Sequence, residues 1–277
     1  MEKKIGFIGT GNMGGALITA ACRGNNPNEV IITDYFLDKA KNLATNLGCY
    51  VAESNEEIVR KSKYIMLGVK PQVLESVVRE ISPILKECIE NGETRILVSM
   101  AAGITIETIK KYLEVEVPII RIMPNTPVSI GKGMVLITTN ILNESEVSNE
   151  QLDEFTHIMK SVGRFDKIKE SEMDECTVAA GCTPAYAYMF IEALADGAVM
   201  AGVSREKAIK YSAQALIGAA SMILETGVHP GELKDAVCSP GGSTIVGVAE
   251  LEKNGFRNAA IQAVLASYYK NKDLGKN

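Results

Sequence analysis

The sequence contains no tryptophan, only two histidines and 5% aromatic residues. The two histidines, His157 and His229, are too few for a histidine-rich metal site, so we expect no metal centre. They are enough for a serine–histidine–aspartate triad, but the G-x-S-x-G motif that would carry the nucleophile is missing. The sequence therefore favours neither a metalloenzyme nor a serine hydrolase.

Long apolar runs, basic clusters and closely paired cysteines are also missing. No apolar run reaches the length that spans a bilayer, and the first residues lead into a predicted strand without a signal peptide. The formal net charge is −5 and there is no basic stripe, which argues against a nucleic-acid partner. The six cysteines form no C-x-x-C pair, as is typical of reduced thiols. We expect a cytoplasmic protein with no membrane and no nucleic-acid partner.

A glycine-rich turn stands near the beginning of the sequence. An apolar run, residues 5–8, leads into the G-x-G-x-x-G pattern of residues 9–14, and an alanine-rich helical pattern follows at once. Gly9 permits a tight turn, Gly11 lets a pyrophosphate approach the backbone, and Gly14 lets the helix pack closely on the strand. The N–H groups at the helix start add a partial positive charge for the phosphates. The alternative is a glycine-rich turn with a purely structural role.

A second predicted strand, residues 29–33, ends in Asp34. This acid follows Gly14 by about 20 residues, the spacing at which a carboxylate binds the adenosine ribose of a dinucleotide. The alternative for Asp34 is a helix cap. Asp34 should accept hydrogen bonds from both ribose hydroxyls and repel a 2′-phosphate, and no arginine occurs from Tyr35 to Lys39. The pattern therefore predicts a dinucleotide site and favours NADH over NADPH.

Strands and helices alternate through the first part of the chain. Strands are predicted at residues 5–8, 29–33, 49–52, 64–69, 95–99, 118–123, 133–139 and 163–168, mostly with helices between them. This alternation predicts an α/β fold, a Rossmann-like, doubly wound and mostly parallel sheet with helices on both faces. Ligands of such sheets bind beyond the carboxyl ends of the strands. Unusual loops fall at those ends, namely Gly9–Gly14, Asp34, Lys70-Pro71, Met100–Gly103 and Pro124–Pro127.

The pattern changes near Glu170, and no strand is expected after it. Helical stretches rich in alanine and glycine follow, and they are too apolar on all sides for one-sided packing. A buried dimer interface would explain this composition, and a thick monomeric core is the alternative. We therefore predict two domains: residues 1–166, which bind the dinucleotide, and residues 167–277, an all-helical domain for dimerisation and substrate binding.

The stretch Ser239–Thr244, with the sequence SPGGST, is the most informative part of the helical half. Its two glycines give the backbone freedom, and a helix is predicted to begin at Ser243 or Thr244. The N–H groups exposed there would form an anion pocket suited to a carboxylate, and Thr244 adds a hydroxyl that can donate or accept a hydrogen bond. A turn followed by an ordinary helix cap is the alternative.

Six stretches taken together resemble one family. They are FIGTGNMG (7–14), VKP (69–71), RIMPNTP (121–127), PAY (184–186), EALADG (192–197) and SPGGST (239–244). With them the chain resembles the pyrroline-5-carboxylate reductases from end to end. The resemblance implies reduction of the C=N bond of 1-pyrroline-5-carboxylate to L-proline, with NADPH or NADH as cofactor. It also implies a homodimer, which some members assemble into pentamers of dimers.

The resemblance implies roles for individual residues as well. Residues expected to bind the cofactor are Ile8, Gly9, Thr10, Gly11, Asn12 and Met13 at the pyrophosphate, Asp34 at the ribose, and Asn55, Val69, Lys70, Pro71, Met100, Ala101 and Ala102 along the nicotinamide half. Residues expected to bind the substrate are Gly241, Gly242 and Ser243 at the carboxylate, Thr244 near the ring nitrogen and Glu170 at the domain junction. The predicted catalytic residues are Thr244, which would orient the ring nitrogen, and Lys70, which would add positive charge. A cyclic imine that binds already protonated needs no strong general acid, which fits a site without a histidine.

One segment departs from the family's pattern. The family usually has Ser-Gly-Ser-Gly before PAY, whereas this chain has Ala180-Gly181-Cys182-Thr183. The departure concerns the shape of the substrate pocket rather than the reaction class. It is the only support for one alternative, a non-catalytic dinucleotide-binding sensor or accessory protein on the same scaffold. The other alternative is a related imine or 2-oxoacid reductase. Dehydrogenases of that kind usually need a catalytic lysine, and Lys207, Lys210 and Lys234 lie in no fitting motif.

Overall fold

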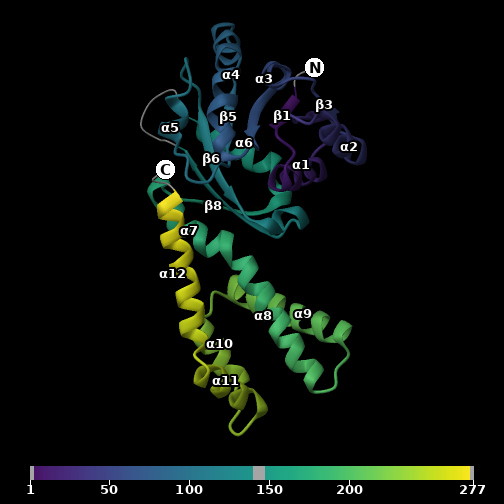
Figure 1. Ribbon diagram of the computed structural model, residues 1–277, viewed down its shortest axis with the longest axis vertical. Coiled ribbons are helices and arrows are strands. Elements are labelled where there is room, and N and C mark those ends of the chain that lie inside the picture. Colours follow the sequence, from purple (N-terminus) through teal and green to yellow (C-terminus); the bar gives the residue numbers. More distant parts are fainter. Residues whose placement is uncertain (1–2, 140–146, 275–277) are drawn as a thin grey trace. The chain divides into compact units, whose positions relative to one another are not determined.

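The computed structural model describes residues 3–139 and 147–274, which form two compact units (Figure 1). We call Met1–Gly181 with Tyr268–Asn277 the sheet unit and Cys182–Ser267 the helical unit. The sheet unit contains all eight described strands. The helical unit contains no strand among its residues, all of which the structure describes.

The sheet has the strand order β3-β2-β1-β4-β5-β6-β7-β8. All neighbouring strands run parallel except β6 and β7, which pair antiparallel. This confirms the predicted mostly parallel, Rossmann-like sheet. The strands are β1 (Lys3–Ile8), β2 (Val30–Thr33), β3 (Tyr50–Val51), β4 (Ser62–Leu67), β5 (Ile96–Ser99), β6 (Ile119–Pro124), β7 (Gly133–Thr139) and β8 (Gly163–Lys167).

Helices cover both faces of this sheet, and each face has its own apolar core. Successive side chains of a strand point to opposite faces, so Tyr64 and Met66 of β4 enter one core while Ile65 and Leu67 enter the other. The first core includes residues of α1 (Asn12–Gly24), α2 (Leu37–Leu47) and α6 (Asn149–Ile158). The second includes residues of α3 (Asn55–Lys61), α4 (Pro71–Glu90) and α5 (Ile106–Lys110). Strands buried on both faces explain the continuous apolar runs of the sequence.

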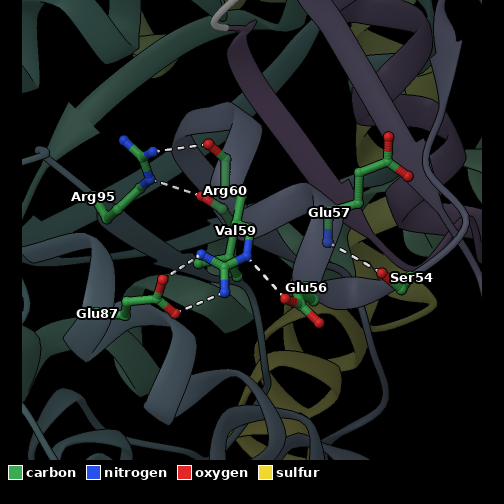
Figure 2. Close-up of polar contacts among 7 residues, drawn as sticks. All are labelled: Ser54, Glu56, Glu57, Val59, Arg60, Glu87 and Arg95. Atoms are coloured by element: carbon green, nitrogen blue, oxygen red, sulfur yellow. Dashed lines mark hydrogen bonds and ion pairs between the residues drawn. The ribbon is translucent and has the colours of Figure 1, made fainter.

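Helix α3 shows how local signals and distant contacts combine. Figure 2 shows the Ser54 hydroxyl accepting a hydrogen bond from the Glu57 N–H at 3.1 Å. The Glu57 carboxylate accepts at 2.9 Å from the N–H of Glu53, the residue before the N-cap, whereas in an ideal capping box it would accept from the N–H of Ser54 itself. At the other end of α3, buried Arg95 donates to the carbonyls of Val59 and Arg60 at 2.7 and 2.9 Å. Arg95 thereby supplies hydrogen-bond donors to carbonyls that have no donor within the helix, because they lie at its end.

Arg60 connects α3 to α4. Its guanidinium donates to Glu56 one turn earlier at 2.8 Å and to Glu87 of α4 at 2.7 Å, as Figure 2 shows. These groups are exposed, so water and salt screen the attraction and each pair adds little stability. The buried side chains of α3, Ile58 and Val59, hold the helix against the sheet.

The helical unit contains α8 (Thr183–Met200), α9 (Arg205–Thr226), α10 (Pro230–Val237), α11 (Ser243–Lys253) and most of α12 (Phe256–Leu274). Helix α8 is tied to α12, because the Tyr186 hydroxyl donates to the Ala263 carbonyl at 3.2 Å. The rings of Phe190 and Phe256 lie 5.2 Å apart between their centroids. From Tyr268 onward α12 belongs to the sheet unit, where the Tyr268 hydroxyl donates to Glu175 at 3.1 Å.

The compact units divide after Gly181 rather than after residue 166, where the sequence places the boundary. The reason is the helix α7 (Met173–Thr177) with the π-helical turn Val178–Cys182 that follows it. Met173 and Val178 are buried, so apolar burial attaches this segment to the sheet unit. The assignment of separate cofactor and substrate roles to two domains stays a prediction.

Candidate active site

The glycine-rich turn has three glycines with different structural reasons. Gly9 has a φ of +103°, and a Cβ added there would lie 2.5 Å from the Gly68 carbonyl oxygen. A Cβ at Gly14 would lie 2.5 Å from the Gly9 carbonyl oxygen. At Gly11 an added Cβ would meet no atom within 4 Å. The fold therefore requires Gly9 and Gly14, whereas the space at Gly11 is free for a ligand.

This turn borders a cleft of about 520 Å³ in the sheet unit. The lining residues are Gly11, Asn12, Met13, Gly14, Lys39, Gly68, Val69, Lys70, Met100, Met123 and Pro124. Apart from Lys39, which lies in the first turn of α2, they lie at or just beyond the carboxyl ends of β1, β4, β5 and β6, where open α/β sheets bind ligands. The cleft thus brings together six predicted cofactor-binding residues, namely Gly11, Asn12, Met13, Val69, Lys70 and Met100.

Helix α1 begins at this cleft. Gly11 is its N-cap residue and provides no side-chain hydrogen bond, and no acidic residue lies in the first turn. The first N–H groups of a helix have no acceptor within the helix and carry a partial positive charge. Open space in front of such a helix end suits a pyrophosphate, so the residues present fit a dinucleotide.

Asp34 lies at the end of β2 beside this turn. One oxygen of its carboxylate accepts from the N–H and from the hydroxyl of Thr10, both at 2.7 Å, and the other accepts from the Phe36 N–H at 3.0 Å. Burial alone would raise the pKa of Asp34, but these hydrogen bonds and the positive charge of Lys39 together lower the pKa below its ordinary value. Asp34 is therefore ionised at neutral pH, and its hydrogen bonds hold the carboxylate in place.

Other predicted cofactor residues lie outside the lining of the cleft. The Asn55 amide donates to the Glu80 carboxylate at 3.0 Å, and buried Ala101 donates its N–H to the Ser99 hydroxyl at 3.3 Å. Pro71 opens α4, as its fixed φ predicts. Ile8, Gly9, Thr10 and Ala102 are likewise not among the residues that line the cleft. Their assignment to the cofactor stays a prediction.

Five residues that line the cleft were not predicted as cofactor ligands, namely Gly14, Lys39, Gly68, Met123 and Pro124. A signal for Gly68 was present, because it directly follows the buried strand β4 and precedes Val69. A Cβ at Gly68 would lie 2.8 Å from the Gly9 carbonyl oxygen, so this glycine lets two loops meet. Lys39 gave no such signal, because a lysine in the first turn of a helix usually faces water.

Glu170 is occupied within the sheet unit. One of its oxygens accepts from the Arg121 guanidinium at 3.0 Å and from the Ile106 N–H, the first of α5, at 2.8 Å. Arg121 is buried in β6, and in the part of the chain that the structure describes its Nε atom has no partner. A buried arginine needs such a counter-charge. These contacts favour a structural role for Glu170, and its predicted contact with substrate stays untested.

The segment that departs from the family's pattern is held by Asn125. This buried side chain accepts from the Met134 N–H at 3.0 Å and donates to the Ala180 carbonyl at 2.9 Å. Ala180 belongs to the π-helical turn Val178–Cys182, a conformation often found at functional sites. The turn satisfies one carbonyl through a side chain of the RIMPNTP stretch, a contact that sequence spacing did not reveal.

The SPGGST stretch forms a turn and a helix start in the helical unit, as predicted. Gly241 has a φ of +69°, and the Gly242 N–H donates to the Ser239 carbonyl at 3.0 Å. Gly242 is the N-cap residue of α11 and provides no side-chain cap. Ser243 and Thr244 form the exposed first turn. The N–H groups of this turn are suited to a carboxylate.

Within residues 3–139 and 147–274, no group of three or more histidine, cysteine, aspartate or glutamate side chains could hold a metal ion. By length and composition alone, the helical stretch Glu170–Met200 could cross a membrane. Of its most apolar segment of 18 residues, 11% is buried. One such stretch is weak evidence of a span, because an apolar helix that packs against a partner has the same composition.

Comparison with known sequences gives two family matches. Residues 4–103 match the family described as "NADP oxidoreductase coenzyme F420-dependent", and residues 170–274 match the family "Pyrroline-5-carboxylate reductase dimerisation". The first match covers the glycine-rich turn and Asp34, and the second covers α7 to α12. A dinucleotide-binding sheet with a helical dimerisation unit defines the class: the protein is an NAD(P)H-dependent oxidoreductase that self-associates.

Relatives along the whole chain make the assignment particular. The pyrroline-5-carboxylate reductase of Escherichia coli (strain K12) is 39% identical over 279 residues, which cover 100% of both chains. The crystal structure of the Plasmodium falciparum pyrroline carboxylate reductase with NADP bound has a TM-score of 0.84 at 32% identity and covers 99% of this chain and 98% of its own. The Coxiella burnetii pyrroline-5-carboxylate reductase structure has a TM-score of 0.86 at 30% identity, with 99% of each chain covered. The chain belongs to the pyrroline-5-carboxylate reductase family.

Proposed function

We propose that this protein reduces 1-pyrroline-5-carboxylate to L-proline, with the cofactor held by the sheet unit and the substrate carboxylate held by the SPGGST turn of the helical unit. The observation that carries the proposal is the open space at Gly11 in front of α1, within a cleft at the carboxyl ends of the strands. Full-length similarity to pyrroline-5-carboxylate reductases supports the substrate.

The residues of the chain act mainly by alignment. A bound reduced nicotinamide supplies the hydride. The first N–H groups of α11, from Ser243 and Thr244, would bind the substrate carboxylate, and the Thr244 hydroxyl would orient the ring nitrogen. A protonated imine carbon is more electrophilic than a neutral one, so the site needs no strong acid. Alignment of two bound molecules can supply about 7–11 kcal/mol in favourable cases.

Lys70 would contribute positive charge at the cofactor cleft. It is exposed, lines the cleft and precedes α4 as its N-cap residue. An ammonium group there would attract the phosphates or the substrate carboxylate, and its simplest alternative is a lysine that faces water. The variant Lys70→Met removes the charge and separates these two roles. If Lys70 attracts the phosphates or the carboxylate, kcat or KM should change; if it only faces water, both should stay native.

We propose NADH as the preferred cofactor. Asp34 is charged at neutral pH, and its carboxylate would repel the 2′-phosphate of NADPH while accepting from the ribose hydroxyls. The Plasmodium falciparum relative is described with NADP bound, so a preference for NADH would distinguish this chain from that relative. Lys39, which lines the cleft near Asp34, is the cationic group that would soften this preference.

We propose a homodimer formed through the helical unit. Large apolar side chains of this unit are exposed, including Ile217, Leu224 and Val246 at 60, 62 and 66%. Between α8 and α9 a hollow of about 550 Å³ is lined by Tyr188, Met189, Ile191, Glu192, Asp196, Arg205 and Ile209. Burial of this surface against a second copy would also account for the apolar stretch Glu170–Met200 without a membrane.

Light scattering gives the mass of the assembly, and a mass of ten copies would indicate a pentamer of dimers. The cytoplasmic location expected from the sequence is part of the same proposal.

The direct test is oxidation of NADH and of NADPH with 1-pyrroline-5-carboxylate, followed by the absorbance of the reduced nicotinamide. Thr244→Ala should lower kcat by about tenfold or more and change KM less, because the hydroxyl acts on the reacting ring. Thr244→Ser keeps a hydroxyl and should retain most of the rate. Dinucleotide binding without turnover of this or related cyclic imines would instead indicate a sensor, and an unchanged kcat in Thr244→Ala would remove Thr244 from the chemistry.

A further inference from the structure

Two large aromatic side chains stand exposed directly after Asp34. Tyr35 is 95% and Phe36 is 70% exposed, and their rings meet edge to face with centroids 5.1 Å apart. Aromatic residues make up only 5% of the chain, and most apolar side chains of the sheet unit lie in its two cores, although Ile130 and Tyr269 are also 69 and 62% exposed. Tyr50, another exposed ring of this unit, is covered by the Lys3 ammonium at 3.2 Å. Tyr35 and Phe36 therefore form an exposed pair that the folding of the sheet unit does not explain.

The backbone around this pair is fixed by the ribose-binding acid. The Phe36 N–H donates to Asp34 at 3.0 Å, and the Phe36 carbonyl accepts from the Lys39 N–H at 2.8 Å. Phe36 is the N-cap residue of α2 and gives no side-chain cap, although serine, threonine, aspartate or asparagine would stabilise that position. A residue that breaks a local rule in this way is typical of a functional site.

The chemistry of adenosine places the base next to these rings. The base is attached to C1′ of the ribose, the carbon next to C2′, whose hydroxyl the acid after the second strand binds in this class of fold. Asp34 is that acid, and Tyr35 and Phe36 follow it without a gap. Every base offers a flat π-face that stacks on aromatic side chains.

We infer that Tyr35 and Phe36 form a stacking platform for the adenine ring of the dinucleotide. The inference rests on the proposed dinucleotide site and adds the residues that recognise its base. The T-shaped contact lets one ring support the other, so the platform is already formed before the base binds. The pair binds the adenosine half and does not touch the nicotinamide half.

The test measures binding of cofactor fragments by isothermal titration calorimetry, with 5′-AMP, NADH and reduced nicotinamide mononucleotide as probes. The double variant Tyr35→Ala with Phe36→Ala should weaken both 5′-AMP and NADH by about ten- to hundredfold. Binding of the mononucleotide should stay unchanged. The matched control Tyr35→Phe with Phe36→Tyr keeps both rings and should bind all three probes as the native protein does. Unchanged affinity for 5′-AMP in the alanine variant, or an equal loss for all three probes, would overturn the inference.

A second variant decides the matter if the alanine variant does not fold. The chain has no tryptophan, so Phe36→Trp introduces a single indole fluorophore and keeps an aromatic ring in place. Saturation with 5′-AMP should quench its emission, whereas the mononucleotide should leave it unchanged. No change with saturating 5′-AMP would overturn the inference. If the native protein binds no NADH, the proposed function is wrong. If it binds NADH but the alanine variant binds 5′-AMP with native affinity, or the indole emission does not respond to 5′-AMP, only the adenine platform is wrong.

Discussion

The sheet unit and the helical unit solve the same problem in different ways. The sheet unit buries its apolar side chains in two cores, one on each face of the sheet. In the helical unit, every residue of which the structure describes, only Ala195 and Ala208 are buried. Both units are rich in apolar residues, so the difference is not one of composition. The sheet unit therefore buries most of its apolar side chains within one chain, whereas the helical unit needs a second surface to cover its apolar side chains.

The difference also separates the two binding functions. The cofactor cleft is built by loops whose shape depends on close backbone contacts inside the sheet unit, such as those of Gly9 and Gly14. The SPGGST turn lies on an exposed helix start of the helical unit. We therefore expect cofactor binding to survive changes that abolish self-association, and turnover not to survive them.

The largest expected effect comes from a charge in the exposed apolar surface of α9. Ile217→Glu would bury a carboxylate in each copy of the interface, a cost large enough to dissociate a dimer. We expect monomers by light scattering, a loss of turnover of about a hundredfold, and NADH affinity within about twofold of native. Ile130→Glu is the matched control, since Ile130 is 69% exposed in the sheet unit. The same mass and the same turnover rate in both variants would contradict the claim that the helical unit, and not the sheet unit, forms the dimer interface.

A pair of glycine variants sharpens the description of the sheet unit. Gly14→Ala places a Cβ 2.5 Å from a backbone oxygen, so it should lower stability by about 3 kcal/mol or prevent folding. Gly11→Ala meets no atom and has a φ of −61°, so its melting temperature should stay near native. Its methyl group should nevertheless obstruct the pyrophosphate and weaken NADH by about tenfold or more. If Gly11→Ala binds NADH as the native protein does, the pyrophosphate does not lie there.

Asp34→Asn tests the charge at the ribose. Removal of the carboxylate should shift the preference between NADH and NADPH toward NADPH by about fivefold, because a charge–charge repulsion of roughly 1 kcal/mol disappears. Steady-state kinetics with each cofactor measures this shift. A native protein that strongly prefers NADPH would show that Asp34 does not repel the phosphate.

The same variant has a defined dependence on pH. The folded-state pKa of Asp34 is lowered, so its ionised form stabilises the native state above the unfolded pKa of about 3.9, and this contribution is lost as the pH falls through the folded pKa. Native protein should therefore exceed Asp34→Asn in stability at neutral pH, and the gap should narrow below about pH 4. Urea unfolding across that range measures the gap. A gap that widens with acid would contradict the hydrogen bonds assigned to Asp34.

The smallest effect on cofactor binding is expected from a buried arginine of the sheet unit that does not line the cleft. Arg95→Met removes donors from the carbonyls at the end of α3 and should lower stability by about 2 kcal/mol, or a few degrees in Tm. Arg79→Met is the control, because Arg79 makes an exposed pair with Glu75 and should change stability by less than about 0.5 kcal/mol. NADH affinity should be native in both. An equal, small effect in both variants would show that buried Arg95 does not hold α3.

The periodicity of the sequence predicted much of the fold. Buried strands appear in the sequence as short apolar runs, and residue types that typically mark helix ends do so in the structure, with Gly48 after α2, Thr105 before α5 and Pro71 at the start of α4. These features are local, because they depend on backbone conformation and on burial of neighbouring residues. The glycine-rich turn was predicted for the same reason.

Contacts between distant residues could not be predicted in this way. Glu170 joins Arg121, and Asn125 joins Ala180, through side chains far apart in the sequence. These contacts connect Glu170 and the π-helical turn to the strands of the sheet unit, and this compact unit extends to Gly181. Spacing along one chain carries no information on such partners, since they depend on how strands and helices meet.

The most direct test of the account measures mass and turnover on the same samples over a wide range of protein concentration. Light scattering reports the assembly, and oxidation of NADH with 1-pyrroline-5-carboxylate reports the specific activity. We predict that specific activity falls as the assembly dissociates into monomers, while NADH binding persists. A monomer with full specific activity would contradict the claim that the helical unit functions only when a second copy covers it.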